Sequence, residues 1–174
     1  MGVDSQPSAE TREPGRRDEW LRMGDGPLHK ECKEERYRAS GPGGQRRNKV
    51  ETSIRLRHEP SGVVVQGEDS RSLAENRKRA MRRLRERIAT SVRQRFDLEN
   101  PSIPAEFARH VSKDGRLTVN NRNRDYAIVV ATVVDAVTAA HGVYSVAAAS
   151  LGLTTSQLRK FLEADREVWR AITK

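Results

Sequence analysis

The stretch from residue 52 to residue 65, TSIRLRHEPSGVVV, has the pattern of a β-hairpin. Ile54 and Leu56 alternate with polar residues, which is the period of a strand that buries one face. The sequence Glu-Pro-Ser-Gly at 59–62 favours a tight turn, and three consecutive valines follow it. Their β-branched side chains predict a returning strand.

The sequence on both sides extends this hairpin into a domain. Residues 31–39 carry too much charge for a buried helix, so we predict a third strand there. Downstream, Ser72 and Glu75 have the spacing of a capping box and open a long helix that runs to about Gln94. Its apolar residues fall on one face: Leu73, Met81, Leu84, Ile88 and Val92. We therefore predict an α+β domain at 28–97, a three-stranded antiparallel sheet packed on a long basic helix.

Residues 1–27 are rich in Ser, Pro, Gly and charge, so a disordered leader is expected there. Within it, Trp20, Leu21 and Met23 are the residues able to anchor a short helical turn. After the α+β domain, Pro101 and Pro104 interrupt the chain, and we predict a linker with a short helix at 98–123.

The last part of the chain, 124–174, is predicted to be an all-α domain. Residues 128–140 are rich in valine, but their length and the interleaved Ala, Asp and Thr favour a buried helix that ends at Gly142. Helices at 144–151 and 156–164, joined through Gly152, have the spacing of a helix-turn-helix.

The second of these helices has two open interpretations. With Thr154 or Thr155 as its cap, it would leave Gln157, Arg159 and Lys160 outward. Those side chains suit docking on nucleic acid or on a ribosome. The alternative is a helical hairpin that packs only against its own chain, with Trp169 closing the small core.

Composition narrows the class of partner. The 174 residues include 33 Lys and Arg against 24 Asp and Glu, a net charge of +9, which favours a nucleic acid first and an anionic membrane second. No signal peptide or membrane-spanning stretch is evident, and the single Cys32 excludes an internal disulfide. The four histidines lack metal-ligand spacing. We expect a cytoplasmic protein with no metal and no small-molecule cofactor.

Residues 40–49, SGPGGQRRNK, carry the chemistry of the α+β domain. The glycines permit backbone conformations with positive φ and a close approach by another molecule. The backbone N–H of Gln45 suits a developing oxyanion, and its neutral amide suits the orientation of a water molecule. Basic residues follow at once, so the loop fits a cavity lined by RNA.

This loop resembles the GGQ loop of class I peptide chain release factors and of the codon-independent rescue hydrolases related to them. Those families show Ser-Gly-Pro-Gly-Gly-Gln, two variable residues and Asn-Lys, as in 40–49. The resemblance covers about residues 31–95 and implies that Gly43, Gly44 and Gln45 are catalytic. In the family the glutamine coordinates the hydrolytic water and is often N-methylated. Here Arg46-Arg47 replaces the common His-Val or Asn-Val, and Leu73 replaces the glutamine of Arg-Ser-Gln.

The resemblance implies that the partners are large-subunit ribosomal RNA and P-site peptidyl-tRNA. We expect a protein that is monomeric off the ribosome. From Arg71 to Arg95 we count ten cations against two acidic residues, which favours phosphate contact over a merely solvated helix face. The expected RNA-binding residues are Arg46, Arg47, Asn48, Lys49, Arg71, Arg77, Lys78, Arg79, Arg82 and Arg83.

Stop-codon recognition is not expected. The sequence contains no Pro-x-Thr and no Ser-Pro-Phe tripeptide, and class I factors carry separate codon-reading domains in chains about twice this long. The first hypothesis is therefore a peptidyl-tRNA hydrolase that rescues stalled ribosomes without a codon. Two alternatives stay open: a helix-turn-helix regulator with an inactive loop, or a truncated release factor that needs a codon-reading partner.

Overall fold

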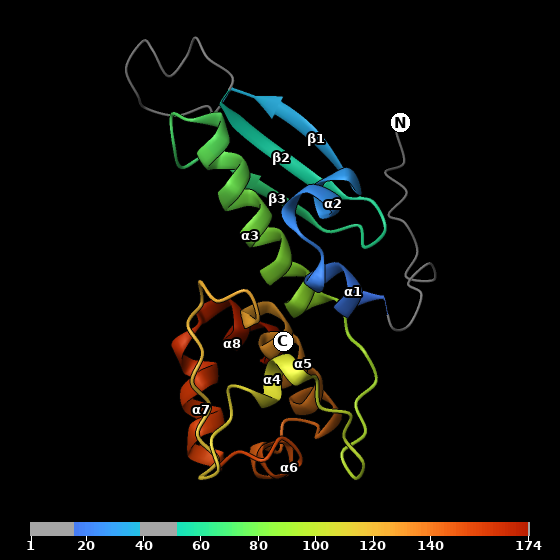
Figure 1. Ribbon diagram of the computed structural model, residues 1–174, viewed down its shortest axis with the longest axis vertical. Coiled ribbons are helices and arrows are strands. Elements are labelled where there is room, and N and C mark those ends of the chain that lie inside the picture. The colour runs from blue at the N-terminus through green and yellow to red at the C-terminus, as the bar shows by residue number, and fades with distance from the viewer. Residues whose placement is uncertain (1–15, 39–51, 174) are drawn as a thin grey trace. The chain divides into compact units, whose positions relative to one another are not determined.

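A computed structural model describes residues 16–38 and 52–173 (Figure 1). The chain divides into two compact units, residues 1–88 and 89–174, and the division falls inside the long helix α3 (Leu73–Ser91). Among the described residues, no helix combines the length and the apolar character needed to cross a bilayer.

The first unit contains the predicted sheet. Its strands β1 (Cys32–Tyr37), β2 (Ser53–His58) and β3 (Val64–Gly67) pair antiparallel in the order β1-β2-β3. The α+β prediction is confirmed, although β3 begins one residue inside the valine run. The reason is the turn: the N–H of His58 donates to the carbonyl of Val63 at 2.9 Å, which leaves Val64 as the first strand residue.

Helix α3 packs on this sheet (Figure 1), as its apolar face predicts. Met81, Leu84 and Ile88 are buried, as are Ile54 and Leu56 of the central strand. A Cβ on Gly67 would lie 2.4 Å from the carbonyl oxygen of Asn76 in α3. Only a glycine therefore permits the end of β3 to approach the helix this closely.

Two short helices replace part of the expected disordered leader. These are α1 (Arg17–Arg22) and α2 (Asp25–Lys30), while residues 1–15 lie outside the described part of the chain. Trp20, Leu21 and Leu28 are buried. Burial of these three large side chains offsets the entropy of ordering a polar, glycine-containing segment.

The second unit is helical: α4 (Ala105–Ala108), α5 (Tyr126–Ala139), α6 (Tyr144–Ser150), α7 (Thr155–Ala164) and α8 (Arg166–Ile172). The valine-rich segment is the helix α5, as predicted, and its residues from Tyr126 to Val137 are all buried. After it Gly142 takes a φ of 78° and donates to the carbonyl of Val137 at 3.0 Å, which ends the helix.

Helices α6 and α7 form the expected helix-turn-helix. Gly152 takes a φ of 67° in the turn, and the Thr154 side chain caps α7 by accepting from the N–H of Gln157 at 3.3 Å. Arg159 and Lys160 are exposed, whereas Gln157 is half-buried. In α8 the fully enclosed side chain is Val168, and Trp169 is only partly covered.

Candidate functional site

The candidate catalytic loop joins two paired strands. Tyr37 at the end of β1 pairs with Ser53 at the start of β2, so the chain leaves the sheet and returns to it at neighbouring positions. The predicted catalytic residues, Gly43, Gly44 and Gln45, lie between them and outside the described residues, as do Arg46, Arg47, Asn48 and Lys49. The described part of this site is therefore its base.

Asn76 of α3 fixes the returning side of that base. Its side-chain amide donates to the carbonyl of Thr52 at 2.8 Å and to the carbonyl of Ser70 at 2.7 Å. Its side-chain oxygen accepts from the N–H of Ser70 at 2.8 Å. The buried asparagine thus joins the start of β2 to the start of α3 with every polar group bonded.

A partly buried ion pair joins β1, the strand that leads into the loop, to helix α3. Arg77 donates to both carboxylate oxygens of Glu34 in β1, at 2.6 and 2.8 Å. His29 adds a contact at 2.8 Å to the same carboxylate. The hydrogen bonds from Arg77 lower the pKa of Glu34 to about 2, against the opposing effect of burial. They also raise the pKa of Arg77.

A second ion pair closes the segment that leads into α3. Arg83 donates to the Asp69 carboxylate at 2.9 Å and to the carbonyl of Gln66 in β3 at 2.9 Å. The guanidinium beside Asp69 keeps the pKa of that carboxyl below its usual value. Further along the helix, Arg85 donates to Asp25 at 2.6 Å and to the carbonyl of Met23 at 2.8 Å.

The cations of the basic helix therefore form two sets. Arg77, Arg83 and Arg85 bond to neighbouring strands and helices of their own unit. The others predicted to contact RNA, Arg71, Lys78, Arg79 and Arg82, are exposed. Long cationic side chains facing solvent are available for phosphate, whereas Arg77 would have to leave Glu34 first.

Tyr37 braces the strand end next to the loop. Its hydroxyl donates to Glu68 at 3.0 Å, and the guanidinium carbon of Arg55 lies 5.7 Å from its ring centroid. Burial, followed by the carboxylate of Glu68, raises the pKa of Tyr37. No local sequence pattern marks Tyr37 or Glu34 as part of the site. The only local sign was that Arg77 lies four residues from Leu73 and Met81, on the edge of the apolar stripe.

A Ser-His-Glu trio elsewhere in the unit has no catalytic geometry. His58 contacts the Ser61 hydroxyl at 2.7 Å through Nδ1 and the Glu31 carboxylate at 3.1 Å through Nε2. Ser61 is buried, and its oxygen already accepts from the N–H of Val63 at 3.3 Å. A nucleophile needs access to a substrate, so this trio serves to close the hairpin turn.

Two other features of the described residues lack the chemistry of hydrolysis. Burial raises the pKa of the Cys32 thiol to about 11, so the thiolate form that would act as a nucleophile is disfavoured.

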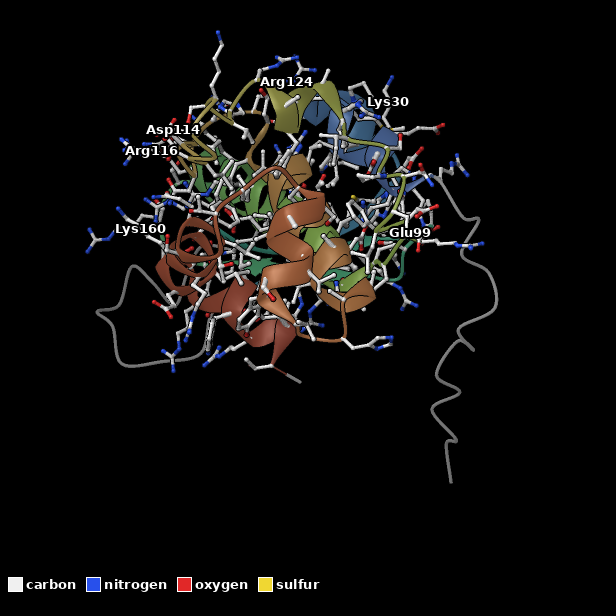
Figure 2. All side chains as sticks on the ribbon, turned by 90° about the horizontal axis from the view of Figure 1, so that it is seen from below. Lys30, Glu99, Asp114, Arg116, Arg124 and Lys160 are labelled. Atoms are coloured by element: carbon white, nitrogen blue, oxygen red, sulfur yellow. The ribbon has the colours of Figure 1, made fainter. Side chains whose placement is uncertain are left out.

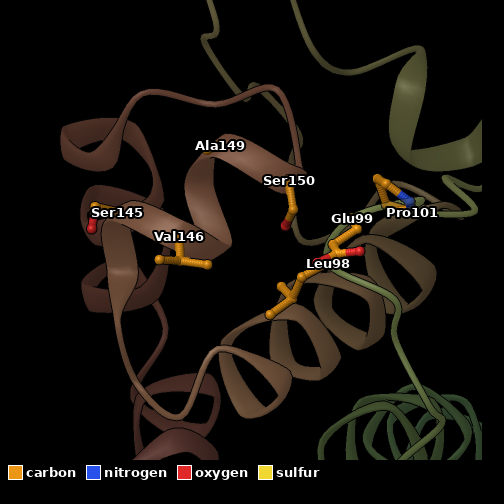
Figure 3. A pocket seen from close by; sticks show the side chains of 7 residues that line it. All are labelled: Leu98, Glu99, Pro101, Ser145, Val146, Ala149 and Ser150. Atoms are coloured by element: carbon orange, nitrogen blue, oxygen red, sulfur yellow. The ribbon is translucent and has the colours of Figure 1, made fainter.

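A shallow depression of about 550 Å³ lies beside α6 (Figure 3). Glu99 is the ionisable residue that lines it, with Leu98, Pro101, Ser145, Val146, Ala149 and Ser150. Among the described residues no cluster of three or more His, Cys, Asp or Glu could hold a metal ion.

Comparison with known proteins matches the sequence of this chain to a protein family. The family model described as the RF-1 domain matches residues 28–135. That span includes the strands, α3 and the glycine loop.

Several curated relatives are named peptide chain release factor 1. Peptide chain release factor 1 of Kocuria rhizophila is 36% identical over 85 residues, which cover 49% of this chain and 23% of the relative. The protein of that name from Geobacter metallireducens is 41% identical over 80 residues, or 46% and 22%. That from Geobacter sulfurreducens is 33% identical over 129 residues, or 74% and 31%. The chain thus spans between 22% and 31% of the length of these relatives, and no solved structure matches it significantly.

Proposed function

The chain belongs to the RF-1 domain family, and from this premise we propose that it hydrolyses the ester bond of peptidyl-tRNA on the ribosome. The observation that carries the proposal is the sequence SGPGGQRRNK at 40–49, placed between two paired strands of a family-matched domain. Gln45 would coordinate the water, and its N–H would stabilise the oxyanion, with Gly43 and Gly44 permitting close approach.

The base of the loop supports this assignment. A loop that delivers one amide to an ester requires its two ends to be fixed, because small displacements of a reacting group cost large factors in rate. Glu34 and Arg77 hold the outgoing strand, and Asn76 holds the returning one. The exposed cations Lys78, Arg79 and Arg82 would then bind large-subunit ribosomal RNA or the tRNA.

We further propose that release needs no stop codon and rescues stalled ribosomes. The support is the absence from the sequence of the Pro-x-Thr and Ser-Pro-Phe tripeptides. A binding role without hydrolysis is the second candidate, favoured by the helix-turn-helix of α6 and α7.

One assay separates these functions. Purified chain is added to ribosomes stalled without a codon in the A site, and release of labelled peptide from P-site tRNA is timed. We expect Gln45→Ala to reduce release on the order of 10²-fold or more, the cost of removing one transition-state donor. Gln66→Ala, at an exposed glutamine of β3, is the matched control and should release normally.

The outcomes are distinct. No release by the wild type on any stalled complex would favour the binding role. Release only with a stop codon, or only after addition of a codon-reading factor, would overturn codon-independent rescue. A Gln45→Ala variant with wild-type rates would overturn the proposed mechanism.

A further inference from the structure

The outward side of α7 is continuous with a tight turn from another part of the second unit. The exposed residues of the two segments form what we term the α7 surface: Lys113, Arg116, Thr155, Ser156, Arg159 and Lys160. Figure 2 shows Arg116 and Lys160 projecting on the same side, with Glu99 of the same unit on the opposite side. The surface thus combines four cations with two hydroxyls.

Backbone hydrogen bonds fix the turn against the start of α7. Val111 and Leu117 pair as an isolated bridge, and the N–H of Ser112 donates to the carbonyl of Arg116 at 2.9 Å. At the tip, the carbonyl of Gly115 accepts from the N–H of Thr154 at 3.2 Å. The turn and the helix are therefore held in one geometry before any partner binds.

Gly115 is the residue that permits this contact. Its φ is 70°, and a Cβ there would lie 3.1 Å from the nitrogen of Thr154 and 3.2 Å from the carbonyl oxygen of Gly152. Both atoms belong to the turn of the helix-turn-helix, so the approach is close on the side where α7 begins. A turn placed in this way extends the binding face of the second helix.

The acidic residues nearby form only long ion pairs with the cations of this surface, although Asp114 also accepts a hydrogen bond from the Ser112 hydroxyl at 2.5 Å. Asp114 lies 3.7 Å from Arg116, and Glu163 lies 3.9 Å from Arg159, with all four side chains more than half exposed. Exposed pairs of this kind contribute little, so phosphate can replace the carboxylates. Arg159 also lies 5.8 Å from the ring centroid of Tyr144, which orients its guanidinium.

We propose that the α7 surface docks on the phosphate backbone of a double-helical RNA segment. A helix-turn-helix presents its second helix to nucleic acid, and the cations and hydroxyls here hold phosphates. The deep, narrow major groove of A-form RNA excludes a helix, so contact is to the backbone and carries no sequence preference. The choice of RNA rests on the proposed function on the ribosome.

The test measures binding of the full chain to a labelled 20-base-pair RNA duplex across a salt series, without ribosomes. Lys113→Glu in the turn and Lys160→Glu in α7 should each weaken binding about three- to tenfold and reduce the salt slope by about 1. Arg166→Glu, an exposed cation of α8 outside the surface, makes the same charge change and should cost less than twofold. This control accounts for RNA bound by α3.

A glycine pair tests the geometry rather than the charge. Gly115→Ala and Gly142→Ala both place a side chain at positive φ, 70° and 78°, but only the first brings a Cβ against the turn that precedes α7. Gly115→Ala should weaken RNA binding severalfold while Gly142→Ala leaves it unchanged, with folding of both checked by circular dichroism.

Three results would overturn the inference: equal losses for Lys160→Glu and Arg166→Glu, equal binding by the two glycine variants, or tenfold tighter binding to DNA of the same sequence. Peptide release is measured separately. Duplex binding that depends on Lys113 and Lys160 in a chain that releases no peptide would leave the docking surface standing and remove only the proposed function.

Discussion

The two units of this protein are stabilised in different ways. In the first, α3 is joined to the sheet by directional polar contacts from Asn76, Arg77 and Arg83 around a small apolar core. In the second, α5 is enclosed by aliphatic packing along most of its length. The difference indicates that the unit bearing the candidate catalytic loop is specified by bonds at particular atoms, which place the loop ends. Aliphatic burial is less directional.

Substitution of Gly67, where β3 lies against α3, should cause the largest loss of stability. In Gly67→Ala the new Cβ would meet the Asn76 carbonyl oxygen at 2.4 Å and the Ala80 Cβ at 3.2 Å. We expect the first unit to lose about 3 kcal/mol, the upper range for overpacking. Hydrogen exchange of the full chain, read on peptides from each unit, should show faster exchange in α3 and β3 only.

Gly26→Ala is the control for that change. No atom outside its chain neighbours lies within 4 Å of the position of its Cβ in α2. Because Pro27 follows, a helical alanine here is mildly strained, and we expect a loss below about 1 kcal/mol, well under that of Gly67→Ala. Equal exchange rates in the two variants would show that β3 does not need a glycine against α3.

A matched pair of polar residues compares the units directly. Asn76→Ala strands the carbonyls of Thr52 and Ser70, and should cost the first unit about 2 to 3 kcal/mol. Thr132→Val removes a hydroxyl that donates to the carbonyl of Ile128 inside α5, at 2.8 Å. That change should cost less than about 1 kcal/mol, because the Ile128 carbonyl keeps its backbone partner in the helix and valine leaves no polar group unpaired. The free energy of unfolding of each variant is measured with denaturant. Similar losses for Asn76→Ala and Thr132→Val would contradict the proposed difference between the two units.

Acid should destabilise the first unit through Glu34. Its pKa is lowered from 4.5 to about 2, so the folded unit binds this proton less readily than the unfolded chain. The contribution is present above about pH 4.5 and is lost as the pH falls towards 2. Because Arg77 is partly exposed and solvent screens the ion pair, we expect Glu34 to contribute about 2 kcal/mol to the free energy of unfolding of the first unit.

Glu34→Gln should reduce the loss of first-unit stability at low pH, measured by hydrogen exchange between pH 2 and pH 6. Glu35→Gln is the control, because this neighbour in β1 is 51% exposed and pairs only loosely with Lys33 and Arg55. If stability falls at low pH in Glu34→Gln as steeply as in the wild type, other carboxylates cause the loss.

Local patterns predicted the elements of both units. The alternation of Ile54 and Leu56 and the tight turn after His58 identified the hairpin, and the length of the valine-rich segment correctly favoured a helix. These signals lie within a few residues of each other in sequence. The helix α1 contains Trp20 and Leu21, which the sequence indicated as anchors of a short helical turn. The helix α2 was not predicted, because it is six residues long and contains few apolar residues.

The base of the candidate site was beyond such patterns. Glu34 and Arg77 are 43 residues apart, and the contact of Asn76 with Thr52 spans 24. Both depend on strand register and on how α3 lies on the sheet, which period alone does not fix. The catalytic assignment of Gly43, Gly44 and Gln45 came from motif chemistry and stays a prediction.

The smallest effect should come from His58, the buried imidazole of the hairpin turn. Desolvation lowers its pKa below 6.5 against the opposing effect of Glu31, so the neutral ring is favoured, with Nε2–H donating to Glu31 and Nδ1 accepting from Ser61. The unfolded chain takes up this proton first as the pH falls. The contribution is therefore full above about pH 6.5 and declines below it.

Ser61→Ala should isolate this contribution. It removes one partner of the ring, while the aliphatic second unit provides an internal reference. We expect faster exchange at β2 and β3 and a changed dependence on pH between 5 and 7, with peptides of α5 unaffected. An identical response of α5 in that pH range would show that the two units do not differ in their sensitivity to protons.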